Sequence, residues 1–180
     1  DKNAGNITYT LSCPFSQELK IDQSLAHNGC CLTVECIEDQ FYKVTAIHET
    51  LEKTNLSSWE IGSKINLERC MLMNGRLDGH IVQGHVDKTG IVTKIEDADG
   101  SFLVSVSYEN LENNFITVPQ GSITVNGISF TVAKSLYNGF AVAVIPYTWE
   151  NTNMQHLKTG DLVNLEFDII GKYIAKLMIK

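Results

Sequence analysis

The sequence lacks the features that would tie it to a membrane or to nucleic acid. No stretch of its 180 residues approaches the roughly 18 consecutive apolar residues that span a bilayer, and no signal-peptide pattern opens it. Lysine and arginine number 14 against 21 aspartates and glutamates, so the net charge is -7. We therefore expect neither nucleic acid nor an anionic membrane surface as a main partner.

Paired cysteine motifs are also lacking. The chain has 5 cysteines, an odd number at irregular spacing, and C-x-x-C does not occur. Neighbouring residues such as Cys30 and Cys31 rarely bridge each other, because their side chains diverge. We predict free thiols, a cytoplasmic location and no structural zinc site.

What the sequence does have is a long repeat. Shifted by 98 positions, residues 24–68 align with residues 122–166 without a gap, and about a third of the aligned positions are identical. The stretch "SLAHNGCCLTV" at 24–34 returns as "SITVNGISFTV" at 122–132. The period is far longer than that of solenoid repeats, which run about 20–50 residues. We predict a duplicated domain, with modules at 1–78 and 79–180.

Each module reads as β-rich. An Asn-Gly turn precedes β-branched and apolar residues in both copies, and we expect strands at 41–47, 62–69, 140–146 and 160–167. "DADG" at 97–100 predicts a hairpin, and 169–180 predicts the start of an amphipathic helix with Ile174, Leu177 and Met178 on one stripe. Short helical turns are expected at 14–21 and 107–115. The fold class is all-β, and many short strands favour small barrels, although pattern alone separates barrels from sandwiches poorly.

The repeat is incomplete at its beginning. We expect residues 80–92 to open the second module as a strand, and subtracting 98 from this segment gives positions before residue 1. Either the first module differs or its first strand is missing. We favour the missing strand, because a barrel without it would expose an edge.

The segment "GRLDGHIVQGHVDKTG" at 75–90 is the first candidate for chemistry. On a regular strand His80 and His85 would face opposite sides, which disfavours a shared metal site unless Gly84 bulges the chain. The segment is either a linker with surface histidines or a turn whose glycines let backbone approach a ligand.

Cys30 and Cys31 are the second candidate. They are either small buried hydrophobic residues or part of a site, and strand alternation places Cys30 in the core with Cys31 on the outer face. In the second copy Ser129 takes the place of Cys31, so two related pockets would differ in chemistry.

Acidic side chains recur in the repeat. We interpret them as solvated or turn-supporting carboxylates: Glu52, Glu68, Glu150 and Glu166. Asp168 has no acidic counterpart, since Cys70 stands there, and is therefore a possible acid or base.

In order and spacing these motifs resemble the riboflavin synthase α-chain family over essentially the whole chain. The motifs are "SLAHNGCCLTV", "ETLEKTN", "GSKINLERCM", "GRLDGHIVQGHVD", "GSITVNGISFTV", "IPYTWENTN" and "VNLEFDIIGKY". Family members open with an "MFTGI"-like segment, which agrees with the missing strand. Relatives often carry lysine at Gln120 and aspartate at Asn126, which bears on ligand affinity in the second module.

The resemblance implies two tandem six-stranded antiparallel β-barrels and a C-terminal helix that assembles a homotrimer. It implies a dismutation of two molecules of 6,7-dimethyl-8-ribityllumazine, by transfer of a four-carbon unit, to riboflavin and 5-amino-6-ribitylaminouracil. No cofactor and no metal takes part, and lumazine synthase is a possible partner. The two substrates would meet between barrels of neighbouring subunits.

The resemblance also implies site residues. Catalytic roles fall to Ser24, Cys31 and His85 in the first module and to Ser129 and Asp168 in the second. The alternative role for His80 is to orient the interface, and Cys30 has a weaker case. The implied substrate contacts are Cys31, Leu32, Thr33, Thr45, Ala46, Ile47, His48, Glu49, Thr50, Gly84, His85, Val86, Gln120, Ser129, Phe130, Thr131, Ile145, Pro146, Tyr147, Thr148, Trp149 and Glu150.

Two other functions stay open. One is a non-catalytic optical protein of the same superfamily that binds lumazine or flavin, and the other is a duplicated interaction module without a small ligand. The intact "NGCCLTV" and "GHIVQGHVD" motifs favour the enzyme.

Overall fold

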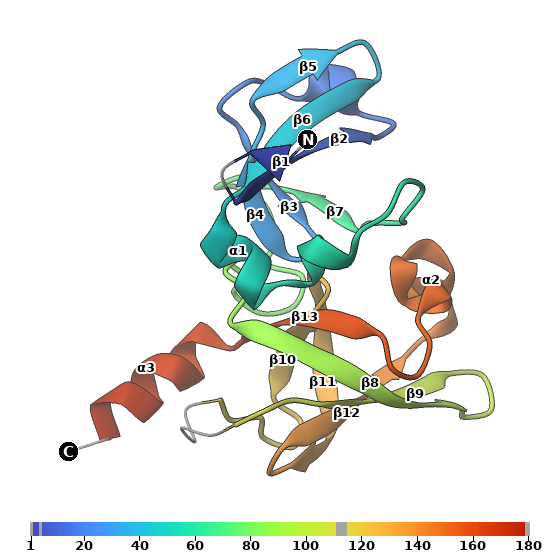
Figure 1. Cartoon of the computed structure of the whole chain (residues 1–180). Helices are drawn as coiled ribbons and strands as arrows, with labels where there is room; N and C mark the ends of the chain where they lie inside the picture. Colours follow the sequence, from blue (N-terminus) through green and yellow to red (C-terminus); the bar gives the residue numbers. More distant parts are fainter. Residues whose placement is uncertain (1, 4, 111–114, 179–180) are drawn as a thin grey trace.

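The computed structural model describes residues 2–3, 5–110 and 115–178. It places two β-rich halves one above the other, and the C-terminal helix projects from the second half (Figure 1). Within the described ranges, no helix is long and apolar enough to cross a membrane.

The second half is a closed barrel. Its strands are β8 (Lys88–Asp97), β9 (Phe102–Ser107), β10 (Ser122–Val125), β11 (Ile128–Leu136), β12 (Gly139–Val144) and β13 (Leu162–Phe167). They are antiparallel in the order β10-β11-β12-β9-β8-β13, and β13 pairs with β10 to close the ring. Alternate residues point inward, so that Val142 and Val144 of β12 are fully buried.

The first half forms two smaller sheets. Its strands are β1 (Lys2–Asn3), β2 (Asn6–Ser12), β3 (Ser24–His27), β4 (Cys30–Thr33), β5 (Cys36–Glu38), β6 (Phe41–Ala46) and β7 (Leu67–Arg69). One sheet has the order β1-β2-β6-β5 and the other the order β4-β3-β7. A closed six-stranded barrel is thus confirmed in the second half, whereas the first half is made of a four-stranded and a three-stranded sheet.

The pairing shows how the first half departs from the barrel plan. β7 pairs with β3 as β13 pairs with β10, and β6 pairs with β2 as β12 pairs with β9. In the second half β8 bridges β9 and β13, whereas β2 and β7 have no strand between them in the described part of the chain. β11 is continuous through a register shift beside Ala133, and its counterpart is broken into β4 and β5.

The Asn-Gly turns were predicted correctly. Asn28 and Gly29 have φ of 46° and 76°, and Asn126 and Gly127 have φ of 47° and 82°. Two consecutive residues with positive φ make the type I′ turn, whose twist suits a two-residue hairpin. The strands expected at 41–47, 140–146 and 160–167 and the hairpin at 97–100 are also confirmed, whereas only Leu67–Arg69 of 62–69 is strand.

Two short helices that were not predicted follow the matching strands β6 and β12. They are α1 (His48–Lys53) and α2 (Pro146–Asn151), each followed by a 3₁₀ turn, η2 (Asn55–Ser58) and η3 (Asn153–His156). The threonine before each turn accepts a hydrogen bond from the N–H two residues on. Pro146 at the first turn of α2 was a signal for a helix start.

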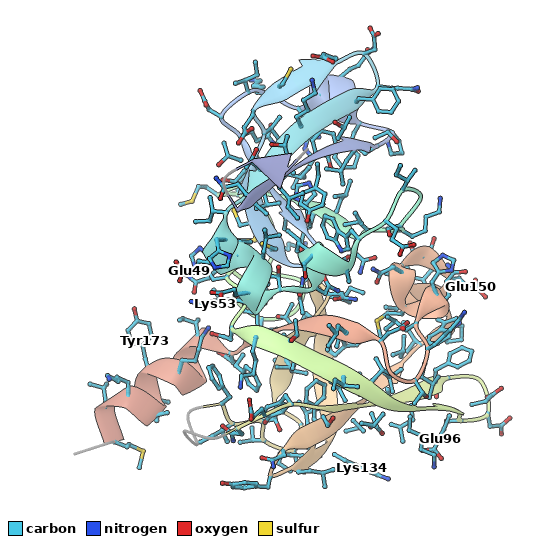
Figure 2. The ribbon with its side chains drawn as sticks, viewed as in Figure 1. Glu49, Lys53, Glu96, Lys134, Glu150 and Tyr173 are labelled. Atoms are coloured by element: carbon cyan, nitrogen blue, oxygen red, sulfur yellow. The ribbon has the colours of Figure 1, made fainter. Side chains whose placement is uncertain are left out.

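The remaining helices were expected. η1 (Ser16–Glu18) is the helical turn predicted at 14–21, and α3 (Ile169–Met178) is the amphipathic helix. Tyr173 projects from α3 into solvent (Figure 2). On α1, Glu49 and Lys53 form an exposed ion pair. The helical turn expected at 107–115 lies partly outside the described residues.

One predicted strand is wrong in its first half. Residues 80–87 are irregular and strand begins only at Lys88. Gly79 and Gly84 have φ of 128° and 78°, a backbone conformation that cannot continue a strand. We call residues 79–87 the strap, because they run along the contact between the two halves.

Asparagines at matching positions join the two halves. The backbone N–H of Asn55 donates to Asn164 Oδ1 at 2.7 Å, and the N–H of Asn153 donates to Asn66 Oδ1 at 2.8 Å. Each bond is the other shifted by 98 positions. The interface is therefore isologous within one chain, as in a two-fold dimer.

The two turns meet at the centre of this interface. A Cβ added at Gly29 would lie 2.7 Å from the backbone nitrogen of Gly127, and one added at Gly127 would lie 2.7 Å from that of Gly29. Glycine is thus required at each position for two reasons, its positive φ and the close approach of the other turn. This confirms that the repeat is a structural duplication.

Candidate functional site

The outer faces of β4 and β11 carry the predicted pair of site residues. Cys30 is buried in the first core, while Cys31 is partly exposed and Thr33 exposed. Ser129 and Thr131 lie on the same face of β11, and Phe130 points into the barrel. The alternation predicted from the sequence is confirmed, and burial raises the pKa of the Cys30 thiol to about 12, so this thiol stays protonated.

A hollow of about 300 Å³ opens on the outer face of the second barrel. Its walls come from β11, β12 and the start of α2. They include the predicted residues Ser129, Phe130, Thr131, Ile145 and Thr148, together with Ala133 and Ala143. Small side chains at these two alanines leave the space open, and neither alanine was predicted as a site residue.

The matching place on the first half is polar. Glu35 and Thr45 stand where the second half has Ala133 and Ala143. Thr45 Oγ1 donates to Glu35 Oε2 at 2.9 Å and lies 2.9 Å from Thr8 Oγ1. A substrate on this face would meet a carboxylate and hydroxyl groups.

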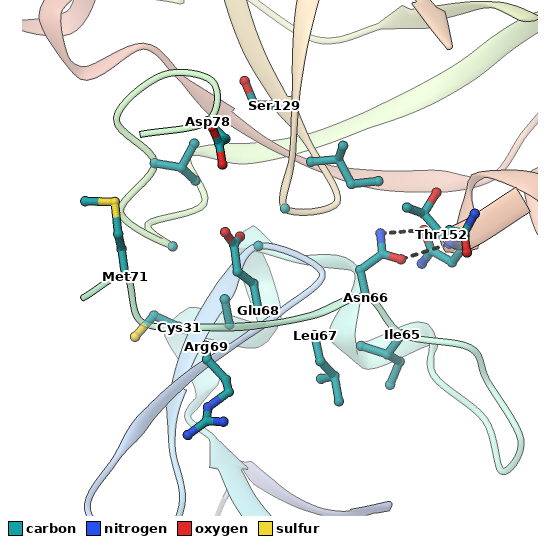
Figure 3. Close-up of a pocket in the computed structure, with 18 of the residues that line it drawn as sticks. Cys31, Ile65, Asn66, Leu67, Glu68, Arg69, Met71, Asp78, Ser129 and Thr152 are labelled. Atoms are coloured by element: carbon teal, nitrogen blue, oxygen red, sulfur yellow. Dashed lines mark hydrogen bonds between the residues drawn. The ribbon is translucent and has the colours of Figure 1, made fainter. Parts of the chain in front are cut away.

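A larger cleft of about 1370 Å³ lies between the halves. Cys31 and Ser129 both line it, together with Glu68, Arg69 and Asp78, so its walls carry charges of both signs (Figure 3). Because Ser129 also lines the hollow, it stands at the edge between the two cavities.

His80 of the strap is hydrogen-bonded to Ser129. Its Nδ1 lies 2.8 Å from Ser129 Oγ, and its Nε2 lies 3.2 Å from Thr124 Oγ1. Partial burial lowers the pKa of His80, although Asp168 and Glu166 act in the opposite direction. The imidazole is therefore mainly neutral at pH 7 and can accept a proton through Ser129.

The second half of the strap contacts both halves of the chain. Gly84 O accepts the N–H of Cys31 at 2.8 Å, while the N–H groups of Gln83, Gly84 and His85 point to the Glu166 carboxylate on β13. His85 is exposed and directly follows Gly84, the strap residue that contacts Cys31, but it lines neither the cleft nor the hollow. Of the two interpretations given for Glu166, the turn-supporting one is confirmed and the solvated one is wrong, because its side chain is buried and accepts these backbone N–H groups.

The other predicted residues are spread around the two faces. Ser24 starts β3 opposite Thr33, and Leu32 and Ala46 are buried, so only their backbone could reach a ligand. Ile47, His48, Glu49 and Thr50 lie at the end of β6 and in α1, and Ile145, Pro146, Tyr147, Thr148, Trp149 and Glu150 occupy the matching place at α2. Val86 lies in the strap, and Gln120 is exposed before β10 with φ of 63°.

Asp168 has a structural role besides its predicted one. Its Oδ1 accepts the N–H of Ile170 at 2.9 Å, which caps the N-terminus of α3. Among the described residues, no group of His, Cys, Asp and Glu side chains is arranged to hold a metal ion.

The duplicated fold matches a known class of protein domain. The Lumazine binding domain family matches residues 2–70 and again residues 83–168. Three solved structures of LumP, in complex with 6,7-dimethyl-8-(1'-D-ribityl) lumazine, riboflavin and flavin mononucleotide, share the fold with TM-scores of 0.82, 0.83 and 0.80. Their identities are 20–22%, and each match covers 92–93% of this chain and 89–91% of the other.

Curated relatives narrow the class. Riboflavin synthase of Actinobacillus pleuropneumoniae is 39% identical over 91% of this chain and 76% of its own length. The riboflavin synthases of Bacillus amyloliquefaciens and Bacillus subtilis are 38% and 34% identical, over 92% and 99% of this chain and 76% and 84% of theirs. The chain belongs to the riboflavin synthase family, a family of transferases.

Proposed function

We propose that the chain catalyses the dismutation of two molecules of 6,7-dimethyl-8-ribityllumazine to riboflavin and 5-amino-6-ribitylaminouracil. One lumazine gives up a four-carbon unit and the other receives it, so the atoms balance without an oxidant or a cofactor. The observation that supports this is the duplicated outer face, with Cys31 and Thr33 on one module and Ser129 and Thr131 on the other. Two like substrates need two like surfaces, and holding them face to face would supply much of the rate.

In the second module we propose that Ser129 and His80 form a proton-transfer pair. The acceptor lumazine must lose a proton from its acidic methyl group, and a neutral imidazole 2.8 Å from a hydroxyl is suited to take it. Thr131, Ile145 and Thr148 would hold the ring in the hollow, and Asp168 would influence the charge near His80.

In the first module we propose that Cys31 and His85 flank the donor lumazine. Attack on its ring carbon requires a nucleophile or a bound water, and Ser24, Cys31 and His85 are the groups assigned to this face. The ring edge would be hydrogen-bonded by Thr33, Thr45 and the backbone from Ile47 to Thr50. The ribityl chain would lie along Gly84 and Val86.

We further propose that the modules span residues 1–78 and 79–180, and that the first is built on the barrel plan of the second without a strand that matches β8 in its described residues. The pairs β3–β7 and β2–β6, which match the pairs β10–β13 and β9–β12, support this. We propose a homotrimer through α3, a cytoplasmic location and lumazine synthase as a possible partner. The apolar side chains that α3 leaves exposed support assembly: Ile170, Tyr173, Ile174, Leu177 and Met178.

Incubation with the lumazine tests the reaction. We expect riboflavin fluorescence to rise with time, and Cys31→Ser to lower kcat about tenfold, or about 1.4 kcal/mol. Cys36→Ser is the matched control, because Cys36 lies on β5 near Glu38 and away from the cleft. Stable bound lumazine without riboflavin would make the chain a binding protein instead. Equal activity of both variants would remove Cys31 from the site.

A further inference from the structure

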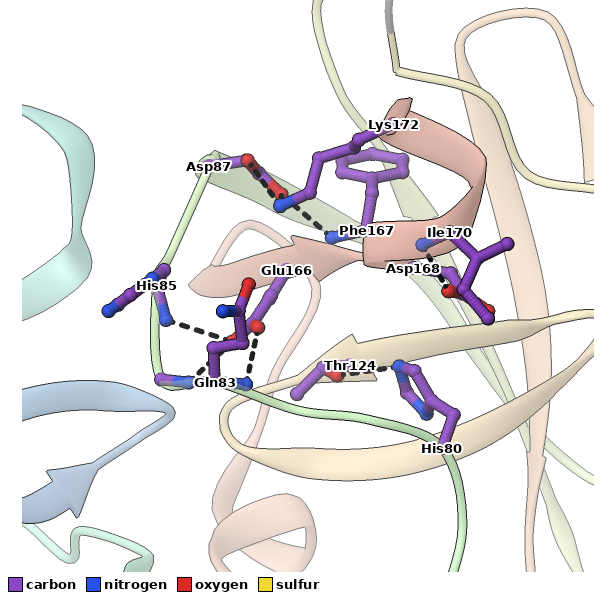
Figure 4. Close-up of polar contacts among 11 residues, drawn as sticks. His80, Gln83, His85, Asp87, Thr124, Glu166, Phe167, Asp168, Ile170 and Lys172 are labelled. Carbon is purple, nitrogen blue, oxygen red and sulfur yellow. Dashed lines mark hydrogen bonds and ion pairs between the residues drawn. The ribbon is translucent and has the colours of Figure 1, made fainter. Parts of the chain in front are cut away.

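The strap is held by one buried carboxylate. Glu166 on β13 is only 2% exposed. Its Oε1 accepts the N–H of Gln83 at 2.7 Å, and its Oε2 accepts those of Gly84 at 2.9 Å and His85 at 3.0 Å (Figure 4). Hydrogen bonds to an ionised acceptor are roughly twice as strong as neutral ones. Three of them make Glu166 the main attachment of this irregular segment to the second barrel.

The attachment reaches the first module through Gly84. The carbonyl of Gly84 accepts the N–H of Cys31 at 2.8 Å, while its N–H is bound to Glu166. A Cβ at Gly84 would lie 2.8 Å from the Cβ of Cys31, so the strap is in close contact with β4. A shift of the strap would therefore move the backbone beside Cys31 and the side chain of His85 together.

A second contact fixes the end of the strap. Asp87 Oδ2 accepts the N–H of Phe167 at 2.8 Å, and both its oxygens lie 3.0 Å from Lys172 Nζ on α3. The pair is partly buried, which makes it stronger than a surface ion pair. β13 and α3 thus hold the strap from residue 83 to residue 87.

We propose that Glu166 is a positioning residue for the reaction: its carboxylate, through three backbone N–H groups, places His85 and Cys31 for the substrate on the first module. The role rests on the proposed function. A glutamine would replace one accepting oxygen with an NH₂ group that faces N–H donors, so at least one strap amide would lose its partner.

The duplication supplies a matched control. Glu68 is the counterpart of Glu166, and it pairs with Ala26 as Glu166 pairs with Thr124. Glu68 is exposed to the cleft, and among the described residues its carboxylate takes part in no hydrogen bond. Glu68→Gln removes only a carboxylate at the cleft, whereas Glu166→Gln also removes hydrogen bonds to the strap. Comparing the two variants therefore separates these effects.

Hydrogen exchange tests the attachment without any substrate. In Glu166→Gln we expect the amides of residues 83–85 to exchange at least tenfold faster, and Cys31 to react several-fold faster with iodoacetamide. In Glu68→Gln the amides of residues 83–85 should exchange as in the parent chain, because Glu68 accepts no hydrogen bond from them. Unchanged exchange in a folded Glu166→Gln would overturn the proposal. If that variant does not fold, Asp87→Asn takes its place, and the amides of residues 85–87 should then exchange faster.

Steady-state kinetics with 6,7-dimethyl-8-ribityllumazine test the functional role. We expect Glu166→Gln to lower kcat about tenfold with a change in KM below threefold, and Glu166→Asp to recover part of kcat because it keeps the charge. Glu96→Gln, a change at a partly exposed residue at the far end of the β8–β9 hairpin, controls for the substitution itself (Figure 2). A loosened strap with unchanged kcat would overturn the positioning role alone. A parent chain that never converts the lumazine would overturn the proposed function, and the role with it.

Discussion

The two halves of the chain are most alike where they touch and least alike in their cores and outer faces. At the contact, Gly29 and Gly127 approach each other in the same way, and the asparagine bonds occur twice. A two-fold interface demands this, because each surface is the partner of its own copy. Away from the axis nothing enforces likeness, and the halves have diverged.

The cores show the first divergence. In the first half His27 is fully buried, its Nδ1 lying 2.9 Å from the carbonyl of Leu25 and its Nε2 lying 2.9 Å from the hydroxyl of Tyr42. Because a carbonyl only accepts, Nδ1 carries the proton and Nε2 accepts from Tyr42. The second half has Val125 and Phe140 at these positions. One core therefore depends on a neutral imidazole and the other does not.

The largest expected effect concerns the shared contact. We expect Gly29→Ala and Gly127→Ala to lower the free energy of unfolding equally, by about 4 kcal/mol each, because positive φ and a backbone clash add together. Chemical denaturation measures this. Gly100→Ala is the control, since Gly100 also has positive φ but nothing lies within 4 Å of an added Cβ. A clear inequality between the two variants would show that the contact is not symmetric.

The second-largest effect is a difference between the two cores in how stability depends on pH. Burial lowers the pKa of His27 to about 4 from 6.5, so the stability that depends on its neutral form is complete above pH 6.5 and is lost as the pH falls from 6.5 toward 4. At pH 5 the first half should have lost about 2 kcal/mol. The double variant His27→Val with Tyr42→Phe should remove this loss.

Each half carries its own reporter for that experiment. Trp59 packs against Tyr9 in the first half, and Trp149 stacks on Phe102 in the second. Two variants are made, each of which keeps only one tryptophan. The fluorescence of that tryptophan then reports the urea unfolding of its own half at pH 7.5 and at pH 5. If the double variant were as acid-sensitive as the parent, His27 would not be the cause.

The smallest effect concerns the outer faces. Ala133→Glu should fill the hollow and weaken lumazine binding to the second module about tenfold, or about 1.4 kcal/mol. Quenching of Trp149, which lies beside Thr148, measures it. Ala133→Ser should bind as the parent does, because its hydroxyl is small. Tight binding to Ala133→Glu would show that the ligand lies elsewhere, for example in the cleft.

Much of the fold could be predicted because its signals are local. The Asn-Gly turns need only two residues, and the alternation along β4 and β11 needs only a strand. The duplication was visible because the contact between the halves keeps its asparagines and glycines. The helices α1 and α2 were missed, since each is too short to show helical periodicity.

The site could be predicted only in part. Cys31 and Ser129 were found because the repeat places them at matching positions and the family resemblance adds roles. Glu166 was interpreted as a solvated or turn-supporting carboxylate, and its sequence neighbours give no sign that the turn it supports is the strap at residues 83–85. Ala133 and Ala143 were missed because they line the hollow by being small.

The sequence by itself determined that this chain consists of two copies of one β-rich module. Turn residues, strand alternation and the repeat are properties of the order of residues along the chain. Only the tertiary structure decided that the strap crosses between the halves, that Glu166 holds it, and that the first core contains a neutral histidine. These depend on which groups lie together and away from water, and burial and hydrogen bonding between distant residues exist only in the folded chain.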